Sequence, residues 1–209
     1  MLELQSSPIS KFFALCSVGV SLLHYLQVVD AYQLYYNKDL IFQHHEYWRL
    51  FTSLFHHGPL GFNALIHILS FLQYATSSES LFFSGRPADF IIFSLFGSAA
   101  MWIFAAFTPI IFLGHIFTSY FTYYWCKRSP DNRVFLMNIP IGINGPYVPL
   151  LFLGISILNT SLKQALPNLI GFGTAHIYFF LHDVINTKFN TRLFYAPDSI
   201  NKALSSVFQ

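Results

Sequence analysis

The sequence has few charged residues for its length. Asp, Glu, Lys and Arg make up 10% of its 209 residues, against about 25% in a typical soluble domain. Hydrophobic residues make up 54% and aromatic residues 19%. A surface so poor in charge cannot face water everywhere, so the composition excludes an ordinary soluble domain. The net charge of +2 also gives no indication of nucleic-acid binding.

Several chemical motifs are also missing from the sequence. Its two cysteines, Cys16 and Cys126, cannot build a disulfide framework. None of the nine histidines forms a His-x-x-x-His pair, and the adjacent pairs His44-His45 and His56-His57 point to different faces of a helix. There is no glycine-rich phosphate loop. We therefore expect neither a metal nor a cofactor.

What the sequence does contain is long stretches without a charged residue. A bilayer core is crossed by about 20 apolar residues in a helix. Four of the stretches supply one span each, and the longest supplies two, separated at Thr108-Pro109. The stretches are Phe12–Val29, Leu50–Ser78, Phe90–Cys126, Val134–Leu162 and Gln164–His182. The prediction is a single all-helical membrane domain over 1–209, with spans near 11–29, 61–78, 90–107, 110–126, 147–163 and 167–185 and a short tail at 186–209.

The basic residues predict the orientation of these spans. With six spans, the N-terminus, the second and fourth connections and the tail share one side of the membrane. That side holds eight Lys and Arg residues, and the other side holds three, Lys38, Arg49 and Lys163. Basic residues are enriched on the cytosolic side, so both termini are expected in the cytosol.

The segment Asp30–Gly61 is longer than a simple connection requires. On a helix, His45, Arg49, Ser53 and His56, with Thr52, share one face, and Trp48, Phe51, Leu54 and Phe55 share the other. This pattern predicts an amphipathic helix at the non-cytosolic membrane surface. An anchor made only of interfacial aromatic residues is the alternative.

Polar residues recur at helical spacing in the second and fourth spans. The second span carries Asn63, His67, Ser70, Tyr74 and Ser77, and the fourth carries His115, Thr118, Ser119 and Thr122. Such stripes line a wet cavity or form hydrogen bonds between helices. Both interpretations stay open. In the sixth span, Gly171 and Ala175 are spaced to let another helix approach closely.

A serine hydrolase is the enzyme class to consider, because it needs an activated serine, a base and oxyanion donors. The sequence has no G-x-S-G. Weak matches lie at Gly154-Ile155-Ser156 and Gly19-Val20-Ser21, and His176 is a candidate base. A histidine hydrogen-bonded within the bundle is the simpler interpretation of His176.

Several motifs occur in an order that is similar to one known family. They are Trp48-Arg49 with Thr52; Gln73-Tyr74, Glu79 and Gly85-Arg86-Pro87-Ala88-Asp89-Phe90; Phe112-Leu113-Gly114 with Trp125, Arg128 and Pro130; and His176-Ile177-Tyr178-Phe179-Phe180-Leu181 with Asp183-Val184. Together they resemble the derlin family of rhomboid-like proteins over roughly 47–197.

The resemblance implies a rhomboid-like bundle of six transmembrane helices in the endoplasmic reticulum (ER) membrane. It also implies a pseudoprotease that helps misfolded proteins leave the ER for degradation. Implied partners are misfolded ER proteins, a membrane ubiquitin-ligase complex, the lipid bilayer, further copies or related chains, and indirectly a p97-type AAA ATPase. If the register is anchored on Gly114, the rhomboid nucleophile position is Ile116, which cannot act as one.

The sequence departs from the family pattern in three ways. Ala175 stands where derlins usually have glycine, His182 stands where the family often has an acidic residue, and the tail has no Gly/Arg-containing ATPase-binding motif. Two other functions remain as alternatives: an active intramembrane protease using Ser156 with His176, and a solute channel or transporter built on the polar stripes.

Overall fold

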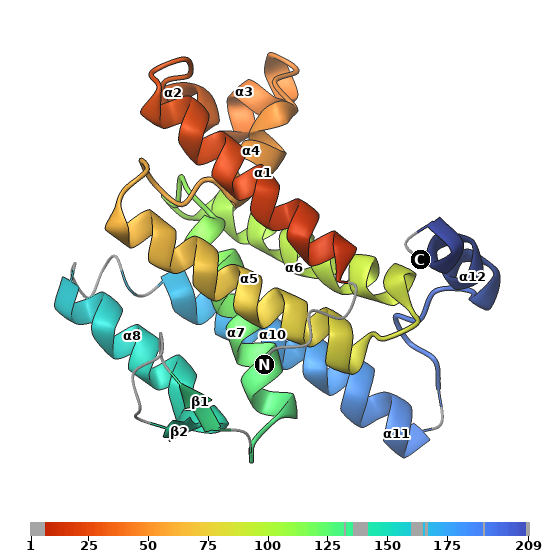
Figure 1. Ribbon diagram of the computed structural model, residues 1–209. Helices are drawn as coiled ribbons and strands as arrows, with labels where there is room; N and C mark the ends of the chain where they lie inside the picture. The colour runs from red at the N-terminus through yellow and green to blue at the C-terminus, as the bar shows by residue number, and fades with distance from the viewer. Residues whose placement is uncertain are drawn as a thin grey trace.

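The structure is a computed structural model that describes residues 7–131, 133–135, 142–159, 165, 167–189 and 191–207. Six long helices dominate it (Figure 1). They are α1 (Pro8–Tyr25), α5 (Phe62–Phe82), α6 (Pro87–Phe107), α7 (Gly114–Arg128), α8 (Val148–Asn159) and α10 (Pro167–Phe179). A helix thus lies at each predicted span, and the mainly helical fold class is confirmed. Residues 160–163 of the fifth predicted span lie outside the described residues.

The break between the third and fourth long helices begins at Thr108. Its backbone is extended before Pro109, because the proline ring disfavours helical conformation in the preceding residue. The chain stays non-helical up to Leu113, so α7 begins at Gly114 rather than near residue 110 as predicted. The fourth helix is therefore shorter than expected.

By length and composition, α6 is the one helix in the described part of the chain that could cross a membrane. α8 with the preceding turn forms a shorter apolar helix. Large apolar side chains nevertheless cover the outside of the molecule, among them Leu15 (70% exposed), Phe107 (85%) and Leu158 (86%). That all six helices cross a membrane stays a prediction.

Shorter elements occupy the two ends of the bundle. α2 (Ala31–Leu34), α3 (Lys38–Gln43) and α4 (Trp48–Phe55) lie at one end. Near the other end are the π-helical turn η3 (Phe180–Ile185), α11 (Asn186–Phe189) and α12 (Asp198–Val207). An antiparallel pair of strands, β1 (Arg133–Phe135) and β2 (Gly142–Asn144), precedes the 3-10 turn η2 (Gly145–Tyr147), with Arg133 opposite Asn144. The hydrophobic pattern of the sequence does not predict these strands.

The predicted amphipathic helix in Asp30–Gly61 is shorter than expected and differently oriented. α4 covers only Trp48–Phe55, so His45 and His56 lie outside it. Its polar residues Arg49 and Ser53 point into the protein, and so do Leu54 and Phe55, which the prediction placed on the opposite, apolar face. Only Trp48 and Phe51 remain exposed. The prediction was wrong here because α4 is packed against the bundle on more than one face.

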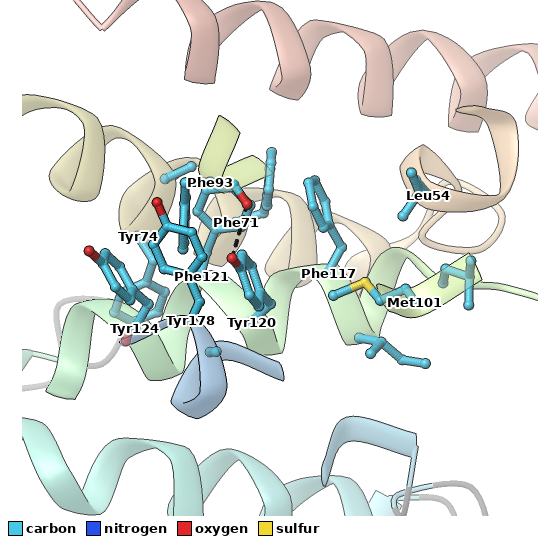
Figure 2. Close-up of a cluster of buried hydrophobic side chains, with 14 of the residues drawn as sticks. Leu54, Phe71, Tyr74, Phe93, Met101, Phe117, Tyr120, Phe121, Tyr124 and Tyr178 are labelled. Carbon is cyan, nitrogen blue, oxygen red and sulfur yellow. Dashed lines mark hydrogen bonds between the residues drawn. The ribbon is translucent and has the colours of Figure 1, made fainter. Parts of the chain in front are cut away.

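The core is a cluster of aromatic side chains around α7, which contacts α5, α6, α8 and α10. Figure 2 shows Phe93, Tyr120, Tyr124 and Tyr178 meeting there. The Phe93 and Tyr120 rings stack with centroids 4.6 Å apart, and the Tyr120 hydroxyl donates to the Phe93 carbonyl at 2.9 Å. This hydrogen bond satisfies the one polar atom that Tyr120 brings into the core, and α7 is fixed as the central helix.

Candidate functional site

Arg49, singled out with Trp48, lies inside the group of short helices. Its side chain is 6% exposed. Nε pairs with Glu46 at 2.5 Å, and Nη1 donates to the carbonyl oxygens of Tyr32 at 2.7 Å and Tyr35 at 3.2 Å. The planar guanidinium suits such simultaneous contacts, because its donors form a rigid fork. Arg49 is therefore a positioning residue that holds the preceding segment against α4.

Thr52 and Trp48, the other two residues of the Trp48-Arg49 motif, differ in their surroundings. The Thr52 hydroxyl donates to the carbonyl of Leu34 at 3.0 Å, which adds a second link to the same segment. Trp48 is 54% exposed and points outward beside Phe51. The motif thus has an inward structural part, Arg49 with Thr52, and an outward aromatic part, Trp48.

We expect Arg49→Ala to loosen residues 30–47 and Trp48→Ala to leave them unchanged. Hydrogen bonds to a charged group contribute roughly 1.5–3 kcal/mol, so amide hydrogen exchange over this segment should accelerate about tenfold or more in Arg49→Ala. Hydrogen–deuterium exchange with mass spectrometry measures this directly. Equal exchange in the two variants would contradict the division of roles.

The two polar stripes of the sequence meet where α5 packs on α7. The His67 and His115 rings lie with centroids 4.2 Å apart, and the Tyr74 ring lies 5.6 Å from that of Trp125. The other members of the stripes are buried or half-buried: Ser70, Ser77, Thr118, Ser119 and Thr122. The side chain of Asn63 lies outside the described residues. In this structure the stripes contact each other across the helix interface.

Histidines gather where α1, α4, α5 and α7 approach. His56 Nε2 lies 3.0 Å from His24 Nδ1, and His57 Nε2 lies 3.2 Å from the Thr118 hydroxyl. Burial, then the neighbouring His24 and His115, lower the pKa of His56 to about 4. The His24–His56 contact therefore needs one ring to donate and the other to accept. Over the described ranges, no group of three or more His, Cys, Asp or Glu residues could hold a metal ion.

The last turns of α5 bind the N-terminal helix, and a glycine turn then leads into α6. Gly85 has a φ of 72°, a conformation that glycine adopts without strain, and it lets the chain reverse into Pro87 at the start of α6. Glu79, 5% exposed, accepts hydrogen bonds from the backbone N–H of Ile9 at 3.2 Å and of Ser10 at 2.8 Å. The carboxylate thus caps the first turn of α1.

Asp89, in the first turn of α6, binds the C-terminal segment. Its side chain is 2% exposed and pairs with Arg86 Nε. The carboxylate also accepts from the backbone N–H of Ala196 at 2.7 Å and from Asn201 Nδ2 at 3.2 Å. Arg86 contacts Asp198 at 3.4 Å. We call these five residues the tail contact; they join positions more than 100 residues apart in the sequence.

α10 packs closely against α7. A Cβ added at Gly171 would lie 2.4 Å from the carbonyl oxygen of Ile116, so only glycine fits there. Ala175 and Tyr178 are fully buried on the same helix. Gly171 and Ala175 therefore sit where a partner helix approaches, and that helix is α7 of the same chain.

The candidate serine and histidine have other partners. His176 Nδ1 lies 2.9 Å from the Tyr123 hydroxyl, between α10 and α7. The Ser156 hydroxyl accepts from Asn168 Nδ2 at 3.4 Å. Ile116, at the nucleophile position implied by the resemblance, is buried and only 2% exposed. These contacts link helices, and they give His176 a structural role.

His182, which departs from the family pattern, packs between two tyrosine rings. Its ring lies between those of Tyr178 and Tyr195, with centroids 5.2 Å and 4.6 Å away. The π-helical turn η3 places this residue, because its wider turn changes which side chains face inward. The tail residues Tyr195, Ala196 and Asn201 were missed as well. Only the Pro197-Asp198 pair before a helical pattern could have signalled an ordered tail.

Comparison with known proteins gives consistent matches. The sequence model of the Der1-like family matches residues 7–198. A probable derlin-2 homolog of Dictyostelium discoideum is 29% identical over 197 residues, covering 90% of this chain and 76% of that protein. Derlin-2.2 of Zea mays is 30% identical over 190 residues, covering 86% and 75%. Derlin-1 of Oryza sativa subsp. japonica is 30% identical over 176 residues, covering 83% and 72%.

Proposed function

Because the chain belongs to the Der1-like family, we propose that it is a non-catalytic factor that helps misfolded proteins leave the ER for degradation. Its six long helices would cross the ER membrane as a rhomboid-like bundle with both termini in the cytosol. The α2–α4 end would then face the ER lumen, and α12 would face the cytosol.

The observation that best supports a non-catalytic role is the surroundings of the candidate catalytic groups. The base His176 contacts Tyr123, and the hydroxyl of Ser156 contacts Asn168. In a serine hydrolase the base is hydrogen-bonded to the nucleophile, whereas Nδ1 of His176 is hydrogen-bonded to a tyrosine hydroxyl. The buried Ile116 at the implied nucleophile position supports the same conclusion.

The polar stripes on α5 and α7 are the proposed route for an unfolded segment. Polar side chains within a membrane lower the cost of placing polar backbone there. Since the ring of His67 meets that of His115 edge-on and the ring of Tyr74 packs at a tilt against that of Trp125, such a route would require α5 to move away from α7. Energy for extraction would come from partners, a ubiquitin-ligase complex and, indirectly, an AAA ATPase.

The test is the half-life of a misfolded ER reporter after translation is stopped. In cells lacking the protein we expect a longer half-life, restored equally by the wild-type chain and by the Ser156→Ala/His176→Ala double variant. A double variant that is expressed and folded but fails to restore turnover would support an intramembrane protease instead. An unchanged half-life in cells lacking the protein would contradict the degradation role. A solute-flux assay with the protein in liposomes tests the transporter alternative.

A further inference from the structure

The C-terminal helix α12 is amphipathic, but its apolar side is not the side that contacts the protein. Ile200, Ala203 and Leu204 share one side of the helix, at the i, i+3, i+4 spacing of an apolar stripe. Ile200 is 49% exposed, Ala203 is exposed, and Leu204 is half-buried. The residue that α12 buries most deeply is the polar Asn201, 5% exposed. An apolar stripe is therefore left facing outward.

Hydrogen bonds at the start of α6 fix the position of α12. Asn201 Oδ1 accepts from the backbone N–H of Ala88 at 3.0 Å, and its Nδ2 donates to Asp89 at 3.2 Å. Both partners belong to the first turn of α6, beside which α12 lies in Figure 1. α6 has 21 residues, about 31 Å at 1.5 Å per residue, which matches a bilayer core of about 30 Å. The first turn of α6 is then at the membrane surface, and so is α12.

The charge around α12 matches the surface of a membrane. From residue 186 onward the sequence has the basic residues Lys188, Arg192 and Lys202 and a single acidic residue, Asp198. The side chain of Arg192 is 80% exposed, with Nη1 3.9 Å from the exposed Asp198 carboxylate, and Lys202 is exposed as well. The cytosolic leaflet carries anionic lipids that attract basic segments by about 1 kcal/mol per Lys or Arg.

We propose that α12 is an interfacial helix whose partner is the anionic lipid surface of the membrane that α6 crosses. The stripe of Ile200, Ala203 and Leu204 enters the boundary between headgroups and acyl chains, and Lys202 stays at the headgroups. Helices of this kind bury an apolar face about 5–10 Å into that boundary. The tail contact with Asp89 then holds the surface helix at the end of α6. The proposal rests on the membrane placement of α6 given above.

The test uses the full-length chain in lipid nanodiscs of phosphatidylcholine with phosphatidylserine. Cys16 is replaced by alanine, and Cys126 is kept because it is buried and only 1% exposed. Single variants Ile200→Cys and Lys202→Cys carry an environment-sensitive fluorophore, and a chain with no added cysteine reports background labelling. Quenching is measured with lipids spin-labelled on the first part of the acyl chain, below the headgroups, and, separately, with aqueous iodide. Lys202 is the matched control, because it lies on the exposed polar side of the same helix.

We expect lipid quenching several-fold stronger at position 200 than at position 202, and iodide quenching in the opposite order. Replacing phosphatidylserine with neutral lipid should weaken lipid quenching at position 200; no change would overturn the electrostatic part of the proposal. Equal iodide quenching at both positions would overturn the proposal, because the stripe would face water. Exclusion of both quenchers from position 200 would also overturn it, because a protein surface would then cover the stripe.

A label on α6 separates this proposal from the membrane placement on which it rests. Leu95 is 56% exposed on the outside of α6, and Leu95→Cys should be quenched by lipids spin-labelled deep in the acyl chains. If position 95 is quenched and position 200 is not, only the interfacial role of α12 fails. If position 95 is not quenched, the membrane placement of α6 fails, and the proposal fails with it.

Discussion

Replacing Gly171 by alanine is expected to destabilise the whole bundle. The added methyl group would lie 2.4 Å from the carbonyl oxygen of Ile116 and 3.1 Å from the backbone nitrogen of Tyr120. Both atoms belong to the backbone of α7, which cannot yield as a flexible side chain could. Overpacking of this kind costs roughly 1–3 kcal/mol. A lower midpoint of thermal unfolding in detergent or nanodiscs would report it.

The same helix offers a matched control for this prediction. A Cβ added at Gly173 would meet nothing within 4 Å. Gly173→Ala changes the same residue type two positions away, and alanine is favoured over glycine in helices by about 1 kcal/mol. We expect Gly173→Ala to be neutral or stabilising. If Gly171→Ala and Gly173→Ala lowered the unfolding midpoint equally, the prediction would be contradicted. The loss would then come from replacing a glycine and not from contact with α7.

Replacing Asp89 by alanine is the second change expected to have a large effect. It would leave the buried N–H of Ala196 and one amide donor of Asn201 without their acceptor, and it would remove the carboxylate that Arg86 pairs with. Each hydrogen bond to a charged group contributes roughly 1.5–3 kcal/mol, and Asp89 accepts two of them from the tail. We expect residues 191–207 to detach and trypsin to cut more rapidly after Arg192 and Lys202. Limited proteolysis followed by mass spectrometry measures this.

Asp198→Ala is the control for that experiment. Asp198 also contacts Arg86, at 3.4 Å, but its side chain is 64% exposed. An exposed ion pair contributes about 0–1 kcal/mol, so this variant should keep the tail attached. If Asp198→Ala released the tail as readily as Asp89→Ala, the surface ion pairs and not the buried carboxylate would hold it.

The two predictions together bear on the proposed function. Gly171→Ala acts on the helix contact that builds the bundle, whereas Asp89→Ala acts on the attachment of one peripheral helix. In the reporter assay we therefore expect Gly171→Ala to fail to restore turnover because less folded protein is present. The Asp89→Ala variant addresses a narrower question, whether a detached α12 still permits turnover by an otherwise folded bundle.

The sequence by itself determined the helical class and the approximate positions of the six long helices. Charge-free stretches locate them, because apolar segments of this length satisfy their backbone hydrogen bonds within a helix. Thr108-Pro109 located a break for a similarly local reason: proline restricts the residue before it. The motif order also indicated the family. None of these inferences required knowing which residues meet in space.

The tertiary structure decided which groups each special residue contacts. Helical periodicity shows which residues share a face, but it does not show what that face meets. Arg49 binds the backbone carbonyls of Tyr32 and Tyr35, and Asp89 binds the backbone of Ala196. Every residue carries such backbone groups, so no residue type in the sequence marks them as partners. Their roles became visible only when the fold brought distant segments together.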